Sequence, residues 1–335
     1  MRKLIFLFLI CGFLTSFFSC RNDELDPNSI FEDGVGDLDS TSYSYPLDLW
    51  LYNNYLTVYN LQFRYKMQDV GSDMNYNLVP VSYNKSIDMS VLVKYLWFDV
   101  YSKIVRPDFL KEYGPRIIHL IGSPAYNPTS GTMILGLAEG GLKITLFRCN
   151  DVNINNVAEL NEYYFKTMHH EFAHILHQQK TYPKDFGLIS LNYYEPLSWQ
   201  DRDDKVAASL GFVSSYAGGQ TREDFVEVIA NYIVKTDVDW KKLMDNASKG
   251  WVVKLKADGD PEYYTDEYGR ERKLYVEAPD TDGVDGVAVI NKKLSICRQW
   301  LRDSWNIELD SLRKEVQYRQ THIDMDFLRN QLKSK

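Results

Sequence analysis

The hydrophobic and polar positions of this chain form short apolar runs in its first half and longer helical patterns further along. Residues 158–180 and 222–234 carry apolar side chains at helical spacing, which predicts two long helices. The sequence Glu139-Gly140-Gly141 predicts a tight hairpin, because glycine supplies the backbone freedom that such a turn needs. Three short apolar runs predict strands, at residues 116–121, 132–137 and 142–147.

The other segments complete an α+β pattern. A strand is predicted at 61–65, and the polar, aromatic segment 182–209 is expected to form loops with short helices. Segment 263–276 is ambiguous, and we interpret it as a hairpin. Four further helices are predicted, at residues 46–55, 88–104, 287–301 and 309–318. This order predicts a small mixed sheet in the N-terminal half and a mostly helical C-terminal half around one cleft.

The first twenty residues have the pattern of an export signal. Arg2 and Lys3 precede an apolar run at 4–18, which is too short to span a bilayer comfortably. The run ends in Ser19-Cys20, which predicts a lipoprotein signal peptide at 1–19 and lipidation of Cys20. The alternative is an ordinary signal peptide with an incidental cysteine. If Cys20 is lipidated, we expect the lipid to be the only contact of the protein with the membrane.

Composition and charge limit the possible domain organisation and the possible ligands. Residues 21–40 hold seven acids and one arginine, so we expect a flexible tether at 20–45 before one domain at 46–335. The 335-residue chain is 44% hydrophobic, which argues against disorder, and its net charge of −8 argues against binding nucleic acid. Cys149 and Cys297 allow either one disulfide or two buried thiols.

One motif in the predicted helix 158–180 carries chemistry. His170, Glu171 and His174 form the pattern HExxH. Histidines four residues apart lie on one helical face, where both rings can bind one Zn²⁺ ion. The glutamate beside the first histidine can accept a proton from the attacking water. The sequence therefore predicts one zinc ion per chain, with Glu171 as the general base.

The apolar residues of this helix lie on the side opposite His170 and His174, so the histidines face something other than the core. A catalytic cleft fits this arrangement, and a polar surface with satisfied histidines is the alternative. His177 shares the histidine face but lies about 10 Å along the axis from His170. We therefore expect His177 to support the site, or to be structural, and not to bind the same ion.

Three glutamates compete for the third ligand position. Lys180 stands where a metzincin would have its third histidine, which excludes that class. Glu195 has a suitable separation, although Pro196 places it in a turn. Glu223 and Glu227 lie on one face of the predicted helix 222–234, where one can bind zinc while the other orients a histidine ring. Glu223 is the strongest candidate, and a solvated acidic first turn is the non-functional alternative.

These motifs resemble those of a known family. HHEFAHILHQ, followed by GFVSSYA and EDFVE, is similar to the zinc metallopeptidases of Bacteroidota lipoproteins, also described as zinc metallohydrolase lipoproteins associated with substrate import. AEGGLKITLFRCN and WNIELDSLRKEV fit the same pattern. The segment SYA…EDFVE also resembles SYG…EFFAE of the anthrax lethal factor catalytic domain. That resemblance implies a gluzincin-like site in which Glu223 binds zinc, Glu227 supports a ligand and Tyr216 stabilises the oxyanion.

The resemblance implies a zincin-like fold and a hydrolase acting on a peptide or glycopeptide, and an ester is a further possibility. It also implies an outer-membrane lipoprotein, exposed at the cell surface, that works with a TonB-dependent importer and its partner lipoprotein. The competing hypothesis is a non-catalytic accessory protein of such an importer. In zincins a strand edge pairs with extended substrate, and either run 132–137 or run 142–147 could provide that edge.

Overall fold

The computed structural model describes residues 38–67, 77–127, 133–134, 136–139, 142–266, 271–279 and 283–333. Contacts divide the chain into two units, Met1–Ser42 and Tyr43–Lys335, and all the elements below belong to the second. The predicted signal peptide, Cys20 and most of the predicted tether lie outside the described residues. Within the described part of the chain, no helix is long and apolar enough to cross a membrane.

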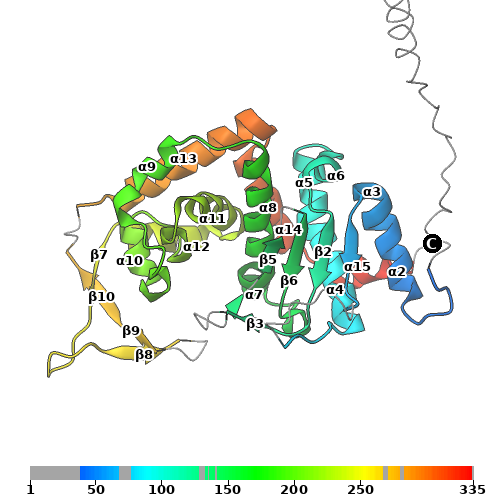
Figure 1. The fold of residues 1–335 in the computed structure, drawn as a ribbon, viewed down its shortest axis with the longest axis horizontal. Helices are drawn as coiled ribbons and strands as arrows, with labels where there is room; N and C mark the ends of the chain where they lie inside the picture. The colour runs from blue at the N-terminus through cyan, green and yellow to red at the C-terminus, as the bar shows by residue number, and fades with distance from the viewer. Residues whose placement is uncertain are drawn as a thin grey trace, which may run out of the picture. The chain divides into compact units, whose positions relative to one another are not determined.

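A four-stranded mixed sheet lies in the same half of the domain as the N-terminal helices, which are drawn in blue and cyan (Figure 1). In spatial order its strands are β1 (Gln62–Arg64), β2 (Ile117–Leu120), β6 (Lys143–Leu146) and β5 (Gly136–Glu139). The first three are parallel, and β5 pairs antiparallel with β6 at the edge. This pairing confirms the predicted hairpin, whose two glycines lie outside the described residues. Because β6 is an inner strand, β5 is the only one of the two that can offer a strand edge.

Three small antiparallel pairs complete the strands. They are β3 (Ala125–Tyr126) with β4 (Met133–Ile134), β7 (Gly250–Val253) with β10 (Tyr275–Ala278), and β8 (Tyr263–Thr265) with β9 (Glu271–Lys273). The β8–β9 pair confirms the hairpin that segment 263–276 suggested. The predicted run 132–137 is divided between β4 and β5, which belong to different sheets.

Helices before β2 confirm the predicted segments 46–55 and 88–104, although each contains a π-helical turn, labelled η1 or η2. They are α2 (Tyr45–Leu51), η1 (Tyr52–Leu56), α3 (Thr57–Tyr59), α4 (Tyr83–Val93), η2 (Lys94–Phe98), α5 (Asp99–Ile104) and α6 (Phe109–Tyr113).

The later helices include two that the sequence pattern did not predict, α12 and α15. In chain order the helical elements are η3 (Cys149–Asp151), α7 (Val157–Leu160), η4 (Asn161–Phe165), α8 (Lys166–Gln179), α9 (Asp185–Ile189), η5 (Leu191–Tyr193), η6 (Trp199–Asp201), α10 (Asp204–Ser209), η7 (Tyr216–Gly218), α11 (Thr221–Val234), α12 (Asp237–Ala247), α13 (Gly286–Trp305), α14 (Leu309–Gln320) and α15 (Met325–Asn330).

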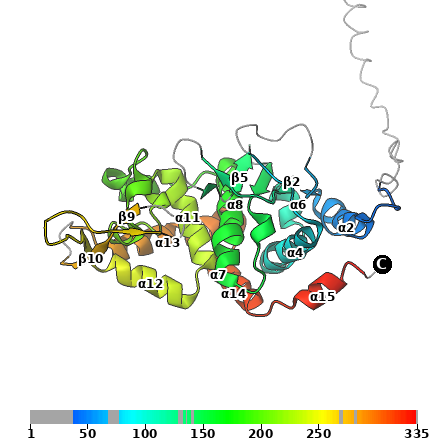
Figure 2. The ribbon, with the colours of Figure 1, turned by 90° about the horizontal axis from the view of Figure 1, so that it is seen from below.

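Helix α8 runs between the sheet and α11 in both views of the domain (Figures 1 and 2). On the side facing the sheet, α8 approaches β5 very closely. A Cβ atom added to Gly136 of β5 would lie 2.3 Å from Cγ2 of Thr167. Phe172, on the predicted apolar face of α8, is fully buried and packs edge-on against Trp97 and Tyr101. Burial of such large rings stabilises the fold strongly, and removing one typically costs about 3–5 kcal/mol.

The two cysteines of the domain are free. Cys149 and Cys297 are both fully buried, and no disulfide joins them. Burial raises the pKa of each thiol, because a thiolate would lose its hydration there. Of the two alternatives left open by the sequence, the structure therefore has the pair of buried thiols.

Candidate metal centre

Helix α8 places the two histidines of the HExxH motif. The helix continues without a break from α7 through η4, and Asn156 caps its start by accepting the backbone N–H of Glu159 at 3.2 Å. His170 and His174 lie one turn apart and face α11, with ring centroids 4.8 Å apart. Phe172 packs on the other side of α8, so one helix serves both the core and the site.

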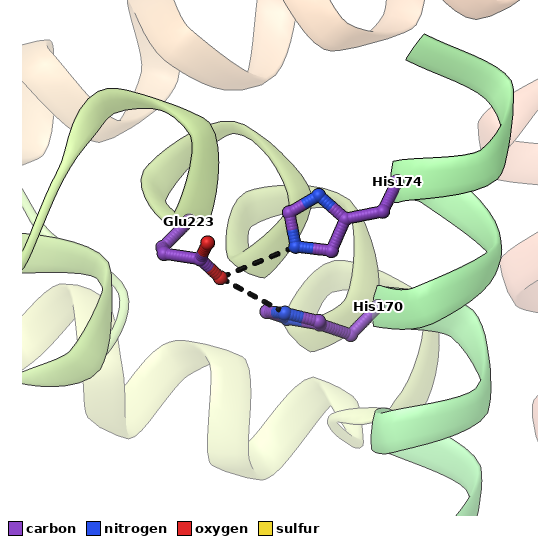
Figure 3. A group of neighbouring side chains, drawn as sticks. All are labelled: His170, His174 and Glu223. Carbon is purple, nitrogen blue, oxygen red and sulfur yellow. Dashed lines mark hydrogen bonds and ion pairs between the residues drawn. The ribbon is translucent and has the colours of Figure 1, made fainter. Parts of the chain in front are cut away.

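Helix α11 brings Glu223 to these histidines (Figure 3). One carboxylate oxygen, Oε2, lies 3.2 Å from Nε2 of His170 and 3.2 Å from Nε2 of His174. Burial alone would raise the pKa of Glu223, but its hydrogen bonds with both histidines outweigh burial and lower that pKa below its usual range. The carboxylate is therefore ionised and directed at both rings.

These three side chains fit a zinc ion. One ligand atom from each can be chosen so that all lie within 4.8 Å of one another, and no other group of this kind occurs among the described residues. Two imidazole nitrogens and a carboxylate oxygen form the His₂Glu donor set of catalytic zinc sites. Three protein ligands leave a fourth position for water or substrate.

Glu227 supports His170 from the side away from Glu223. Its Oε1 lies 2.8 Å from Nδ1 of His170, while Oε2 accepts hydrogen bonds from Ser214 and Asn231 at 2.6 and 3.0 Å. A carboxylate at Nδ1 favours the tautomer with the proton there and leaves Nε2 free to bind a metal. Of the two glutamates on α11, Glu223 thus faces both histidines, and Glu227 orients the ring of His170.

His177 occupies the equivalent position behind His174. Its Nε2 lies 2.8 Å from Nδ1 of His174. Burial and the neighbouring His174 lower the pKa of His177 to about 4, so its ring is neutral at neutral pH. Nε2 of the neutral ring can accept a hydrogen bond from the Nδ1–H of His174, which again leaves Nε2 of His174 for the metal.

Glu171 lies next to His170 at the site. Its half-buried carboxylate makes no hydrogen bond with any other described residue. Burial raises the pKa of Glu171 above its usual value, although the nearby histidines act in the opposite direction. This carboxylate is therefore available for proton transfer, in contrast to Glu223 and Glu227.

Tyr216 borders the same group from η7. Its ring centroid lies 5.8 Å from that of His170, and Trp199 packs edge-on against it at 4.8 Å. Burial raises the pKa of the Tyr216 hydroxyl, and so do the charge of Glu223 and a hydrogen bond with it. The hydroxyl therefore keeps its proton, and with 37% of the residue exposed it can meet a ligand.

The remaining candidate, Glu195, is not brought to the histidines. Its Oε1 pairs with Nη2 of Arg202 at 2.8 Å, and its side chain is 48% exposed. The turn containing Pro196 explains this placement, because it directs Glu195 toward Arg202 and away from α8. The structure thus gathers His170, Glu171, His174, Glu223 and Tyr216 into one site, with Glu227 and His177 behind it.

Two residues that support the site were not anticipated from the sequence. Asn231 could have been found, because it follows Glu227 by four positions and therefore lies on the same helical face. Ser214 gives no periodic signal, because it lies in the irregular segment between α10 and η7. Only the tertiary structure shows its contact with Glu227.

Comparisons with known proteins identify the family of this chain. A family model described as "Putative zinc-binding metallo-peptidase" matches residues 40–310. The crystal structure of a protein with the same description, from Bacteroides caccae ATCC 43185, is 36% identical to this chain. The match covers 89% of this chain and 99% of that one, with a TM-score of 0.66. No curated protein sequence matches. The α+β fold and the resemblance inferred from the sequence are confirmed, and the chain belongs to this family of zinc-binding metallo-peptidases.

Proposed function

We propose that this protein is a zinc-dependent peptidase in which His170, His174 and Glu223 bind one zinc ion. The observation that carries the proposal is the convergence of these three side chains beside the uncommitted carboxylate of Glu171. A zinc ion held there would supply Lewis-acid chemistry, polarising the scissile carbonyl and lowering the pKa of the attacking water.

Glu171 acts as the general base in this proposal. It accepts a proton from the attacking water and later delivers that proton to the leaving amine. A pKa raised by burial suits both steps, because the group must gain and lose a proton in each turnover. Glu223 and Glu227 are unsuited to this role, because hydrogen bonds to histidines commit them.

Tyr216 donates a hydrogen bond to the oxyanion that develops on the substrate carbonyl. Its hydroxyl remains protonated at neutral pH and lies beside His170, which is what such a donor requires. Strand β5 supports the proposal from the sheet side, because it is the edge strand and packs on α8. We expect an extended peptide substrate to pair with this edge.

The test uses the chain without residues 1–20. Elemental mass spectrometry should find about one zinc per chain, and a peptide library should be hydrolysed. The Glu171→Gln variant should retain zinc and lose about 10²–10⁴-fold in activity, the usual contribution of a general base. Glu162→Gln, an exposed glutamate of η4, is the matched control and should behave like the unaltered protein. A chain that stays metal-free after incubation with zinc would refute the proposal.

We further propose that the protein is a surface lipoprotein anchored through Cys20 and that it serves a TonB-dependent importer by cleaving peptides or glycopeptides. The lipobox-like Ser19-Cys20, the acidic segment after it and the family resemblance support this. Labelled palmitate should be incorporated into the unaltered chain and not into Cys20→Ala. If Glu171→Gln supported import as well as the unaltered protein does, the non-catalytic accessory role would be favoured instead.

A further inference from the structure

Ser214 makes two hydrogen bonds that join different parts of the proposed site. Its Oγ donates to Oε2 of Glu227 at 2.6 Å and accepts the backbone N–H of Ala217 at 3.1 Å. Ala217 follows Tyr216 directly in η7. A hydroxyl has one donor and two acceptor positions, so both bonds can form at the same time.

The contact with Glu227 continues to the metal-binding side. The other oxygen of Glu227 lies 2.8 Å from Nδ1 of His170. An unbroken chain of polar contacts therefore runs from His170 through Glu227 and Ser214 to the backbone beside Tyr216. Glu227 is only 2% exposed, so water cannot readily replace a donor that is lost. The Ser214–Glu227 contact is also charge-assisted, which makes it one of the stronger hydrogen bonds.

The segment around Ser214 is held firmly at other points. The backbone N–H of Ser215 donates to Oδ1 of Asp204 at 2.7 Å, and the buried ammonium of Lys293 donates to the carbonyl of Gly211 at 2.8 Å. These contacts fix the segment to α10 and α13. The side chain of Ser214 then connects the segment to Glu227. We infer that Ser214 is a positioning residue that sets the orientation of His170, through Glu227, together with the place of Tyr216.

This inference rests on the proposed function, since it assigns a role within the same site. The effect of losing the Ser214 hydroxyl is limited by Asn231, which also donates to Oε2 of Glu227, at 3.0 Å. Loss of the Ser214 hydroxyl therefore leaves Glu227 with one donor on that oxygen. We expect the effect of Ser214→Ala on zinc affinity to be smaller than that of Glu227→Gln and near the low end of the range for outer partners of ligands, about 10-fold.

The test compares three variants in the chain without residues 1–20. Ser214→Ala should lower zinc affinity about 10-fold in chelator competition and lower kcat with little change in KM, because Tyr216 acts in the transition state. Ser214→Thr keeps the hydroxyl and should restore both values. Ser215→Ala is the matched control, because the Ser215 side chain makes no hydrogen bond with the described residues and only its backbone contacts Asp204.

A second comparison asks whether Ser214 acts through Glu227. In a Glu227→Gln background, Ser214→Ala should cause little further loss of zinc affinity, since residues of one hydrogen-bonded chain are not additive. The inference is overturned alone if the unaltered protein binds zinc and Ser214→Ala binds it equally well, or if the two losses add in full. A chain that binds no zinc at all overturns the proposed function and this inference together.

Discussion

Where α8 packs against α11, two adjacent regions contain similar residues in different surroundings. His170 and Glu223 lie in the candidate metal site, whereas their sequence neighbours His169 and Asp224 lie in the core behind it. The residue types in the two regions are the same or similar. Their surroundings differ, and the comparison shows how surroundings decide what a histidine or a carboxylate does.

In the site region, the carboxylates of Glu223 and Glu227 lie on either side of the ring of His170. Burial disfavours protonation of His170, yet the hydrogen bonds that its ring donates to Glu223 and Glu227 outweigh burial and raise the pKa of His170 to about 10. These contacts can be exchanged for a metal, because the same Nε2 and Oε2 atoms would bind it. The region is therefore arranged for a cation.

In the core region, His169 and Asp224 each make contacts through one side-chain atom, while His169 Nε2 and Asp224 Oδ1 are buried without a hydrogen-bond partner among the described residues. His169 has no nearby acid, so burial alone lowers its pKa to about 3 and keeps the ring neutral, with Nδ1 3.0 Å from the hydroxyl of Tyr101. Asp224 and Lys293 are both fully buried and pair at 2.7 Å, and Tyr194 donates to the same carboxylate at 2.8 Å. These buried side chains contribute to stability and are shielded from solvent.

The largest effect should follow a change at Glu223. Glu223→Gln should lower zinc affinity by more than the roughly 100-fold that loss of an outer partner costs, and hydrolysis should be lost with the metal. Chelator competition and a peptide assay measure the two effects. Glu195→Gln is the control, because Glu195 is paired with Arg202 outside the site. Loss of zinc from that control, with retention in Glu223→Gln, would reverse the assignment of the third ligand.

A change in the core region should act on stability. Lys293→Met leaves the carboxylate of Asp224 buried without its cation and should lower the free energy of unfolding by about 3–5 kcal/mol. Urea denaturation measures this loss. Lys292→Met, at the exposed neighbouring position, should stay within about 0.5 kcal/mol.

The same variant sharpens the comparison between the regions. The Asp224–Lys293 pair joins α11 to α13 and is not part of the group formed by His170, His174 and Glu223. Folded Lys293→Met should therefore bind zinc almost as well as the unaltered protein. Strong zinc loss without loss of stability would show that the two regions are not separable.

Tyr216→Phe should have a narrower effect within the site region. Removing one donor to an oxyanion typically costs about 10²–10³-fold in kcat. We expect that loss with zinc affinity and KM nearly unchanged, because the hydroxyl is not among the three metal-binding groups. Steady-state kinetics on the zinc-loaded variant measures it. An unchanged kcat would leave Tyr216 as an aromatic side chain that only packs against Trp199.

The smallest effect concerns the pH dependence of His169. Its pKa in the folded protein, about 3, lies below the usual 6.5, so the unfolded chain takes up the proton first as the pH falls. The stability that the neutral ring contributes is present above pH 6.5 and is lost as the pH falls toward 3, at about 1.4 kcal/mol per pH unit. In His169→Gln this part of the acid sensitivity should be absent. Parallel urea denaturation of both proteins between pH 7 and 4.5 measures it, and equal slopes would contradict it.

Helical periodicity accounts for how much of the site the sequence reveals. The spacing of His170, Glu171 and His174 fixes their relation on one helix, because three to four residues make one turn whatever the helix packs against. The same periodicity predicted α8, α11 and the apolar face of Phe172. We did not predict α12 and α15, which bury only two side chains and one, respectively. The division of 132–137 between two sheets depends on pairing with distant strands and is not a matter of local periodicity.

The sequence by itself therefore determined the two histidines, the glutamate between them and the family. Only the tertiary structure decided that Glu223 faces the site, that Glu227 lies behind His170 and that Glu195 pairs with Arg202. Glu223 is 49 residues from His174, and the rotation of α11 about its axis follows from packing against α8 and α13. Local sequence sets positions within one helix, whereas contacts between helices set which of their faces meet.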